Sequence, residues 1–73
     1  RNCEVIGMVW SRWVEDTIYS LYRRYDIKGL DEQQKKLKSI CMNELNAHEA
    51  IKNEIKNDSQ LEFFIIQMAL ENL

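Results

Sequence analysis

The chain has 73 residues, of which 45% are hydrophobic and 30% charged, and its formal net charge is -2. This balance is typical of one globular domain, and two glycines with no proline are too few for the turns of an all-β fold. The slight acidic excess argues against a dedicated nucleic-acid binder, and no apolar run has the length of a membrane span.

Residues 3–27 are predicted to form the first helix. Asn2 is a suitable N-cap, because its side-chain oxygen can accept a hydrogen bond from a free N–H of the first turn. Gly29 is placed to end the helix, because glycine adopts the left-handed conformation at this position without a steric penalty.

Residues 31–56 are predicted to form the second helix. Asp31 can act as its N-cap, with Gln34 three residues later as the reciprocal partner of a capping box. The pair Asn57 and Asp58 is expected to end this helix.

Residues 59–73 are predicted to form the third helix, with Ser59 as the N-cap and Glu62 completing a capping box. The sequence therefore predicts an all-α fold, a small three-helix domain that is completed as a bundle by oligomerisation. The chain begins with Arg1 rather than Met, and we expect it to be a fragment of a larger protein.

The first predicted helix carries a coherent apolar stripe with 3.6-residue spacing. The stripe comprises Ile6, Trp10, Trp13, Val14, Thr17, Ile18, Leu21 and Tyr25. Tyr19 falls on the opposite, charged side and is expected to be exposed. The tryptophans are suited to core packing and also to an interface, where Trp and Tyr are enriched at binding hot spots.

The second predicted helix is mostly polar, with a narrow apolar stripe of Leu37, Ile40, Cys41, Ile51 and Ile55. Glu44 and His48 are one turn apart and fall near the middle of that stripe. We predict that they form a polar pair that fixes the register between helices. Cys41 would give this group only three metal ligands, so no metal is predicted.

The third predicted helix is apolar on nearly every side, which requires cover on more than one side. Two other helices cannot easily cover it, and a domain of this size is marginally stable alone. We therefore predict that one side of this helix forms an interface with a second chain. Phe64 marks one side of the helix and Phe63 the other, and the sequence alone does not choose which side faces the partner. The predicted interface residues are Trp10, Trp13, Phe63, Phe64, Ile66, Leu70 and Leu73.

The acid-then-apolar pattern from Asp58 to Leu73 resembles the short C-terminal protein-interaction helices of the BESS type found in insect regulators. The resemblance covers sixteen residues and transfers no functional residue.

Cys3 and Cys41 are too few for the disulfide framework of a small secreted fold. We expect both thiols to be reduced and the protein to be intracellular, in the cytoplasm or the nucleus.

The predicted function is a non-catalytic protein–protein interaction module that forms a homodimer or docks a partner. No cofactor, small-molecule substrate or membrane partner is expected, and the chain lacks the polar clusters and glycine-rich loop of an enzyme site. The alternative is a small helical nucleic-acid-binding domain that uses a basic corner near the first predicted turn. That corner comprises Arg23, Arg24, Lys28, Lys35 and Lys36.

Overall fold

The computed structural model describes residues 6–25 and 31–72, which contain four helices and no strand. The helices are α1 (Ile6–Arg24), α2 (Asp31–Ala47), α3 (Glu49–Glu54) and α4 (Asp58–Asn72). The predicted all-α fold class is therefore confirmed. The predicted N-cap Asn2, the ending at Gly29, and residues Cys3, Lys28 and Leu73 lie outside the described residues.

The second predicted helix is divided, because the chain leaves the helical conformation at His48. The backbone angles of His48 are φ -132° and ψ 91°, which are extended values. The stretch 31–56 is therefore not one helix but α2 followed by the six-residue α3. The physical reason is tertiary: the chain must turn back after α2 so that Ile55 and α4 can join the core.

α4 begins one residue earlier than predicted, and its cap is Asn57 rather than Ser59. The Asn57 side-chain oxygen accepts a hydrogen bond of 2.9 Å from the backbone N–H of Gln60. The Gln60 side-chain oxygen in turn accepts one of 2.6 Å from the backbone N–H of Lys56. This reciprocal arrangement resembles a capping box and leaves Glu62 available for a tertiary contact.

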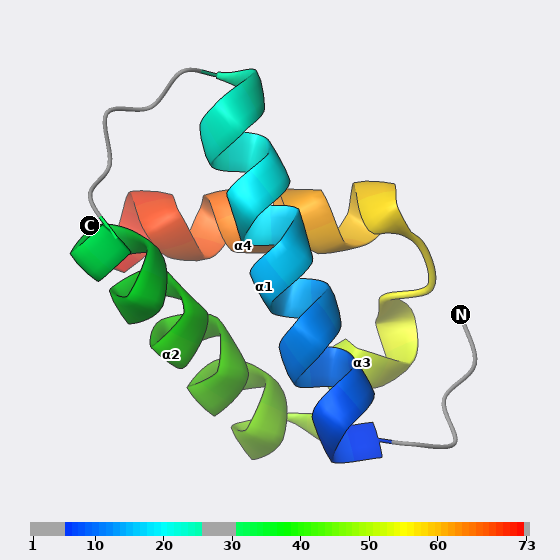
Figure 1. Ribbon diagram of the computed structural model, residues 1–73. Coiled ribbons are helices and arrows are strands. Elements are labelled where there is room, and N and C mark those ends of the chain that lie inside the picture. Colours follow the sequence, from blue (N-terminus) through cyan, green and yellow to red (C-terminus); the bar gives the residue numbers. More distant parts are fainter. Residues whose placement is uncertain (1–5, 26–30, 73) are drawn as a thin grey trace.

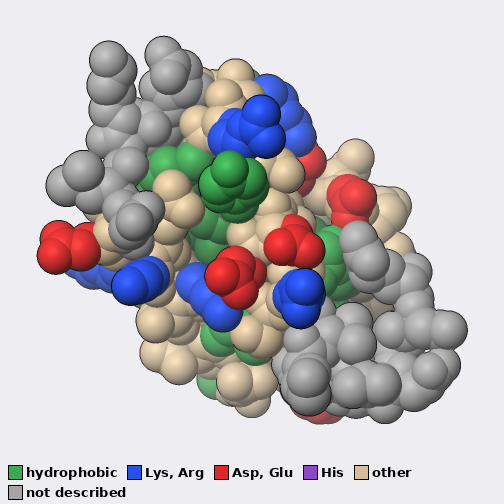
Figure 2. All heavy atoms as spheres, in the orientation of Figure 1, with side chains coloured by type: hydrophobic (Ala, Val, Ile, Leu, Met, Phe, Trp, Pro, Cys, Tyr) green, Lys and Arg blue, Asp and Glu red, His purple; other side chains and the backbone are tan. Residues whose placement is uncertain are grey.

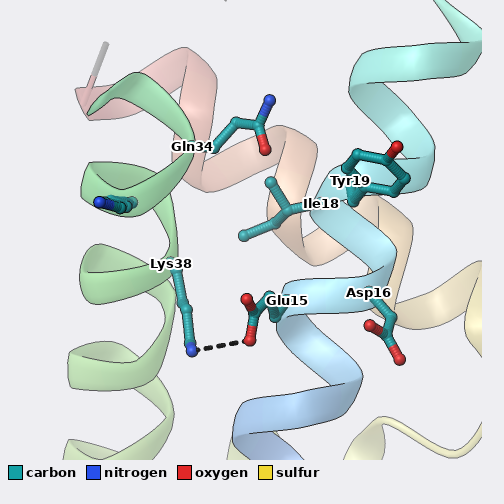
Figure 3. Close-up of a pocket in the computed structure, with 7 residues that line it drawn as sticks. Glu15, Asp16, Ile18, Tyr19, Gln34 and Lys38 are labelled. Carbon is teal, nitrogen blue, oxygen red and sulfur yellow. Dashed lines mark hydrogen bonds and ion pairs between the residues drawn. The ribbon is translucent and has the colours of Figure 1, made fainter. Parts of the chain in front are cut away.

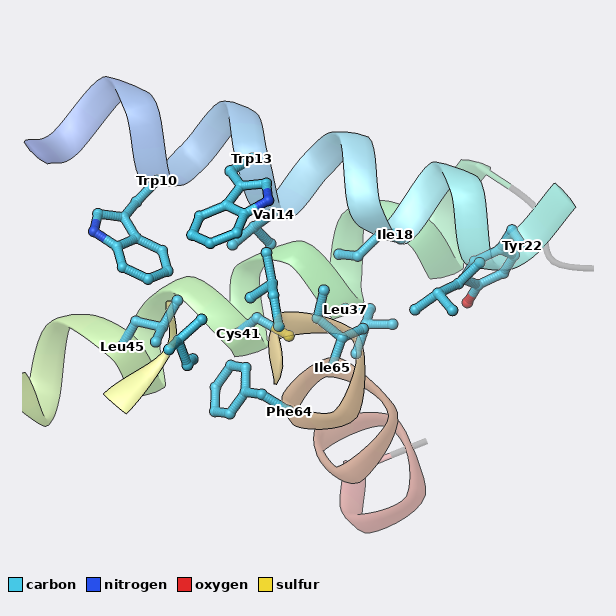
Figure 4. Close-up of a cluster of buried hydrophobic side chains, with 13 residues drawn as sticks. Trp10, Trp13, Val14, Ile18, Tyr22, Leu37, Cys41, Leu45, Phe64 and Ile65 are labelled. Atoms are coloured by element: carbon cyan, nitrogen blue, oxygen red, sulfur yellow. The ribbon is translucent and has the colours of Figure 1, made fainter. Parts of the chain in front are cut away.

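Three of the helices enclose the core. α1, α2 and α4 all contact one another, whereas α3 lies against α2, and Figure 1 shows α4 crossing behind α1. Their buried side chains point toward one another in Figure 4, where the Trp10 and Trp13 ring centroids are 5.1 Å apart. The buried hydrophobic residues are Trp10, Trp13, Val14, Ile18, Leu21, Tyr22, Leu37, Cys41, Leu45, Ile55, Leu61, Phe64 and Ile65.

Two core positions differ from the sequence-based expectation. Tyr25, which the predicted stripe included, is 60% exposed just after α1 ends at Arg24, whereas Tyr22, which the stripe omitted, is buried. On α2 the buried line includes Leu45, which the predicted stripe omitted. The spacing Leu37, Cys41 and Leu45 is a regular i, i+4, i+8 ridge that the sequence already contained.

Candidate protein-interaction surface

α4 has an inward face in the core and an outward face with three exposed apolar residues. Leu61, Phe64 and Ile65 are buried. Phe63 is 66% exposed, Ile66 40% and Leu70 81%, and their i, i+3, i+7 spacing aligns them along one side of the helix. We call these three residues the outer stripe.

Two side-chain contacts fix how α4 is rotated about its axis. The Trp13 indole Nε1–H donates a hydrogen bond of 2.7 Å to the Asp58 carboxylate in the first turn of α4. One turn further along α4, the Arg24 guanidinium donates two hydrogen bonds to Glu62, of 2.9 and 3.2 Å. Both contacts run from α1 to α4, so they hold the outer stripe away from the core.

The Arg24–Glu62 pair also shifts the titration of both groups. The hydrogen bonds to the guanidinium lower the pKa of Glu62 below its ordinary value. The same contact raises the pKa of Arg24, so both groups are charged at neutral pH. This bidentate pairing therefore joins α1 to α4 as an ion pair.

No charged residue occurs between Glu62 and Glu71, an interval that contains the whole outer stripe. The exposed neighbours of the stripe include Gln67, which is polar but uncharged. Depletion of charge at the centre of an apolar patch is a compositional feature of protein interfaces.

A groove borders the outer stripe where α3 faces α4. Its cavity volume is about 510 Å³, and Phe63 belongs both to its lining and to the stripe. Ile51, Ile55 and Met68 supply much of its apolar wall, and Glu54 is the one charged residue among the lining residues described. The apolar surface of α4 therefore continues into a concave region beside it.

The structure separates the predicted interface residues into two groups. Trp10, Trp13 and Phe64 are at most 8% exposed and belong to the core of the protomer, so they present no free surface. The three residues of the outer stripe are the members of the predicted set that are exposed, and Leu73 lies outside the described residues.

Glu44 and His48 approach each other, but not in the middle of a buried stripe as expected. Nε2 of His48 lies 3.6 Å from Oε2 of Glu44. The His48 side chain is 57% exposed and the Glu44 side chain 39%. The reason is that Leu37, Cys41 and Leu45 form the buried line of α2, so its neighbours turn toward solvent. The role of this pair in helix register stays a prediction.

Cys41 is fully buried, and burial raises the pKa of its thiol to about 12. Its side chain lies in the core, whereas His48 is exposed, so these two do not meet at one site. Within the ranges that the structure describes, no group of three or more His, Cys, Asp or Glu side chains could hold a metal ion.

The basic corner is partly neutralised by contacts within the fold. Arg24 pairs with Glu62, and the Arg23 guanidinium carbon lies 5.7 Å from the centre of the Tyr19 ring. On the face of Figure 2, Lys and Arg side chains are interspersed with Asp and Glu side chains. That face therefore presents both signs of charge rather than a continuous basic patch.

A second cavity, of about 360 Å³, lies between α1 and α2 (Figure 3). Lys38 crosses it to form a 3.1 Å ion pair with Glu15. Its remaining charged lining residues, Asp16 and Lys35, are of opposite sign. The charges that line this cavity are therefore balanced.

Comparison with known proteins finds no family model, curated protein or solved structure that matches this chain. Among the helices described, none is both long and apolar enough to cross a membrane. Over the described residues, the fold and the surface thus define a small all-α domain with a charge-free apolar stripe on α4.

Proposed function

We propose that this chain is a non-catalytic protein-interaction module that forms a homodimer through the outer stripe of α4. The observation that carries the proposal is the exposure of Phe63, Ile66 and Leu70 together on the side of α4 that faces away from the core. The free, buried thiol of Cys41 is consistent with a reducing intracellular setting, cytoplasmic or nuclear.

Burial of these three side chains against another protein surface would be strongly favourable. Removing a large apolar side chain from water contributes about 1.5–3 kcal/mol, and a two-fold interface uses each residue twice. A chain of 73 residues has a small core of its own, so this additional burial adds to the stability of the folded protomer.

The partner we propose is a second copy of the chain, because of the charge pattern of the stripe. Near a two-fold axis each residue lies close to its own copy, so a charged residue there would face a like charge. The interval from Phe63 to Leu70 has no charge and avoids this repulsion. Glu62, which pairs with Arg24 of its own chain, and Glu71 flank it, and the basic residues concentrated in the first half of the chain can face Glu71 across an antiparallel dimer.

The test is to place charges in the outer stripe and measure the mass in solution. The double variant Phe63→Glu, Leu70→Glu is expected to elute as a monomer of 8.8 kDa, whereas the unmodified chain gives twice that mass by light scattering. Circular dichroism should show the same helicity for both, because the two positions are exposed in the protomer.

Tyr19→Glu is the matched control, since Tyr19 is 54% exposed but lies on α1, outside the stripe. This variant should remain dimeric. A cooperatively folded monomer for the unmodified chain at tens of micromolar (about the range of a weak dimer) would contradict the proposal. So would a dimer that withstands both charges in the stripe.

A further inference from the structure

The break between α2 and α3 is not required by the residues at the break. Gly and Pro, the usual helix breakers, are absent from residues 31–56. The residues on either side of His48 are Ala47 and Glu49, both good helix formers. His48 is the N-cap of α3 but makes no side-chain capping hydrogen bond. Local sequence therefore favours one continuous helix, and the bend is imposed from elsewhere.

The bent conformation also leaves α3 poorly supported. It has six residues and none of them is buried, and helices of this length are marginal on their own. The backbone N–H of His48 bonds to the Glu44 carbonyl at 3.1 Å, and the Ile51 N–H bonds back to His48 at 3.0 Å. Each helix end at the break leaves backbone groups without helical partners, and a continuous helix would pair them.

The contacts of α4 hold the bend in place. α4 contacts both α1 and α2 through Leu61, Phe64 and Ile65, and Asp58 and Glu62 bond to residues of α1. In Figure 1, α3 turns back from the end of α2 toward the start of α4. Every one of these contacts joins α4 to residues that precede the break. An identical second chain presents the same residues.

Straightening the break would separate α4 from its own α1. A continuous helix over residues 31–54 would measure about 36 Å at 1.5 Å per residue, as long as the protomer's longest dimension of 34 Å. Its end would continue along the axis of α2 instead of turning back. The three residues 55–57 that lead to α4 span at most about 10 Å. This short connection limits how far α4 can fold back toward α1 of its own chain.

We infer that His48 is the hinge of an exchange between two copies of the chain. In the exchanged dimer α2 and α3 form one helix, and α4 of each chain packs on α1 and α2 of the other. The inference rests on the proposed self-association and adds to the outer-stripe interface an exchange of the inward faces of α4 between the two chains. The contacts of α4 with α1 and α2 are the same in both forms. The contacts of α3 with α2 are replaced in the exchanged form by the backbone hydrogen bonds of a continuous helix.

The first test compares Glu49→Pro with Glu49→Ala. Glu49 is the first residue of α3, where proline is well tolerated, and the extended backbone of His48 suits a residue that precedes proline. In a continuous helix the same proline would lie in the interior and clash with the preceding turn. The dimer association constant of Glu49→Pro, measured after refolding at high concentration, should be at least about 100-fold below that of Glu49→Ala.

The second test keeps the inference open to disproof if the proline variant does not fold. His48→Asn supplies a good N-cap for the bent form, and His48→Ala favours the continuous helix. Both remove the contact with Glu44 equally. The dimer association constant of His48→Ala should exceed that of His48→Asn by a factor of about five for each of the two hinges in the dimer.

The outcomes separate this inference from the proposed function. Equal association within each variant pair would overturn the exchange. If the charged double variant Phe63→Glu, Leu70→Glu were still monomeric in that case, dimerisation through the outer stripe would stand without exchange. A cooperatively folded monomer for the unmodified chain and for His48→Ala would overturn both.

Discussion

α1 and α4 are both rich in apolar residues, but they distribute them differently around the helix. On α1 the described apolar side chains from Trp10 to Tyr22 form one buried stripe, while Tyr19 is exposed among charged neighbours. On α4 they occur on nearly every side, and the residues of the outer stripe stay between 40% and 81% exposed in the protomer. α1 is therefore completed by its own chain, whereas α4 has a further apolar surface that remains exposed in the protomer.

The difference shows how a small domain can divide its hydrophobic residues between folding and association. Burial on the inward face of α4 stabilises the protomer, because those side chains pack between α1 and α2. The outward face is not part of that buried core, and most of its apolar surface can gain free energy from burial only against another surface. Substitutions on the two faces should therefore have separable effects.

The largest expected effect concerns Phe64 and Phe63, two adjacent phenylalanines of which the first lies on the inward face of α4 and the second on its outward face. Phe64→Ala should lower the free energy of unfolding by about 3–5 kcal/mol, because Phe64 is 8% exposed in the core. Phe63→Ala should change it by less than about 0.5 kcal/mol. Denaturant titration at a concentration low enough to keep the chain monomeric measures both. Equal losses would show that the two faces are not distinct.

A smaller effect is expected at Cys41, which tests whether the core beneath α4 is closed. Cys41→Ala should cost about 1 kcal/mol or somewhat more, since a small buried group is removed. In a Cys3→Ser background, the native thiol should react with a thiol reagent only through unfolding. Rapid labelling under native conditions would contradict the closed core.

The raised pKa of Cys41 makes the stability difference between the unmodified chain and Cys41→Ala depend on pH. Burial raises the pKa of the thiol in the folded chain to about 12, above the unfolded value of about 8.5. The folded state therefore favours the neutral thiol, and this contribution is complete below about pH 8.5. It declines as the pH rises toward the folded pKa. The stability difference between the unmodified chain and Cys41→Ala should shrink over that alkaline range.

The smallest effect is expected at the ion pair that connects α1 to α4. Arg24 lowers the pKa of Glu62, so this contribution is present above the unfolded pKa of about 4.3 and is lost as the pH falls through the lower folded value. Because the Arg24 side chain is 48% exposed, solvent screens the pair and the effect on stability is small.

Glu62→Gln tests this contribution when its denaturation midpoint is compared with that of the unmodified chain from neutral to acidic pH. The two midpoints should differ slightly at neutral pH and converge in acid. A difference that is constant with pH would mean that the pair is not the cause.

Much of the fold follows from short-range properties of the sequence. The all-α class, the approximate extents of α1 and α4, and the exposure of Tyr19 depend on periodicity, capping and the lack of turn residues. The separation of Phe64 and Leu61 from the outer stripe also follows from helix geometry, because 3.6 residues make one turn wherever the helix lies.

Other features of α4 depend on residues far away in the sequence. Asp58 meets Trp13 from 45 positions away, and Glu62 meets Arg24 from 38 positions away. Local patterning instead assigned Glu62 to a capping box, because a motif cannot show that a distant arginine competes for the same carboxylate. The same limit left the inward side of α4 undecided until its contacts with α1 and α2 were known.

The sequence by itself determined that this protein is a set of helices, the last of them apolar on nearly every side, with more apolar surface than a small core requires. Only the tertiary structure decided that Phe64 faces inward and Phe63 outward, and that the chain turns at His48 although its residues favour a helix there. The physical reason is that helix propensity contributes roughly a few tenths of a kcal/mol per residue. Burying one large apolar side chain contributes about 1.5–3 kcal/mol. Packing of α4 and Ile55 therefore outweighs the local preference for a continuous helix.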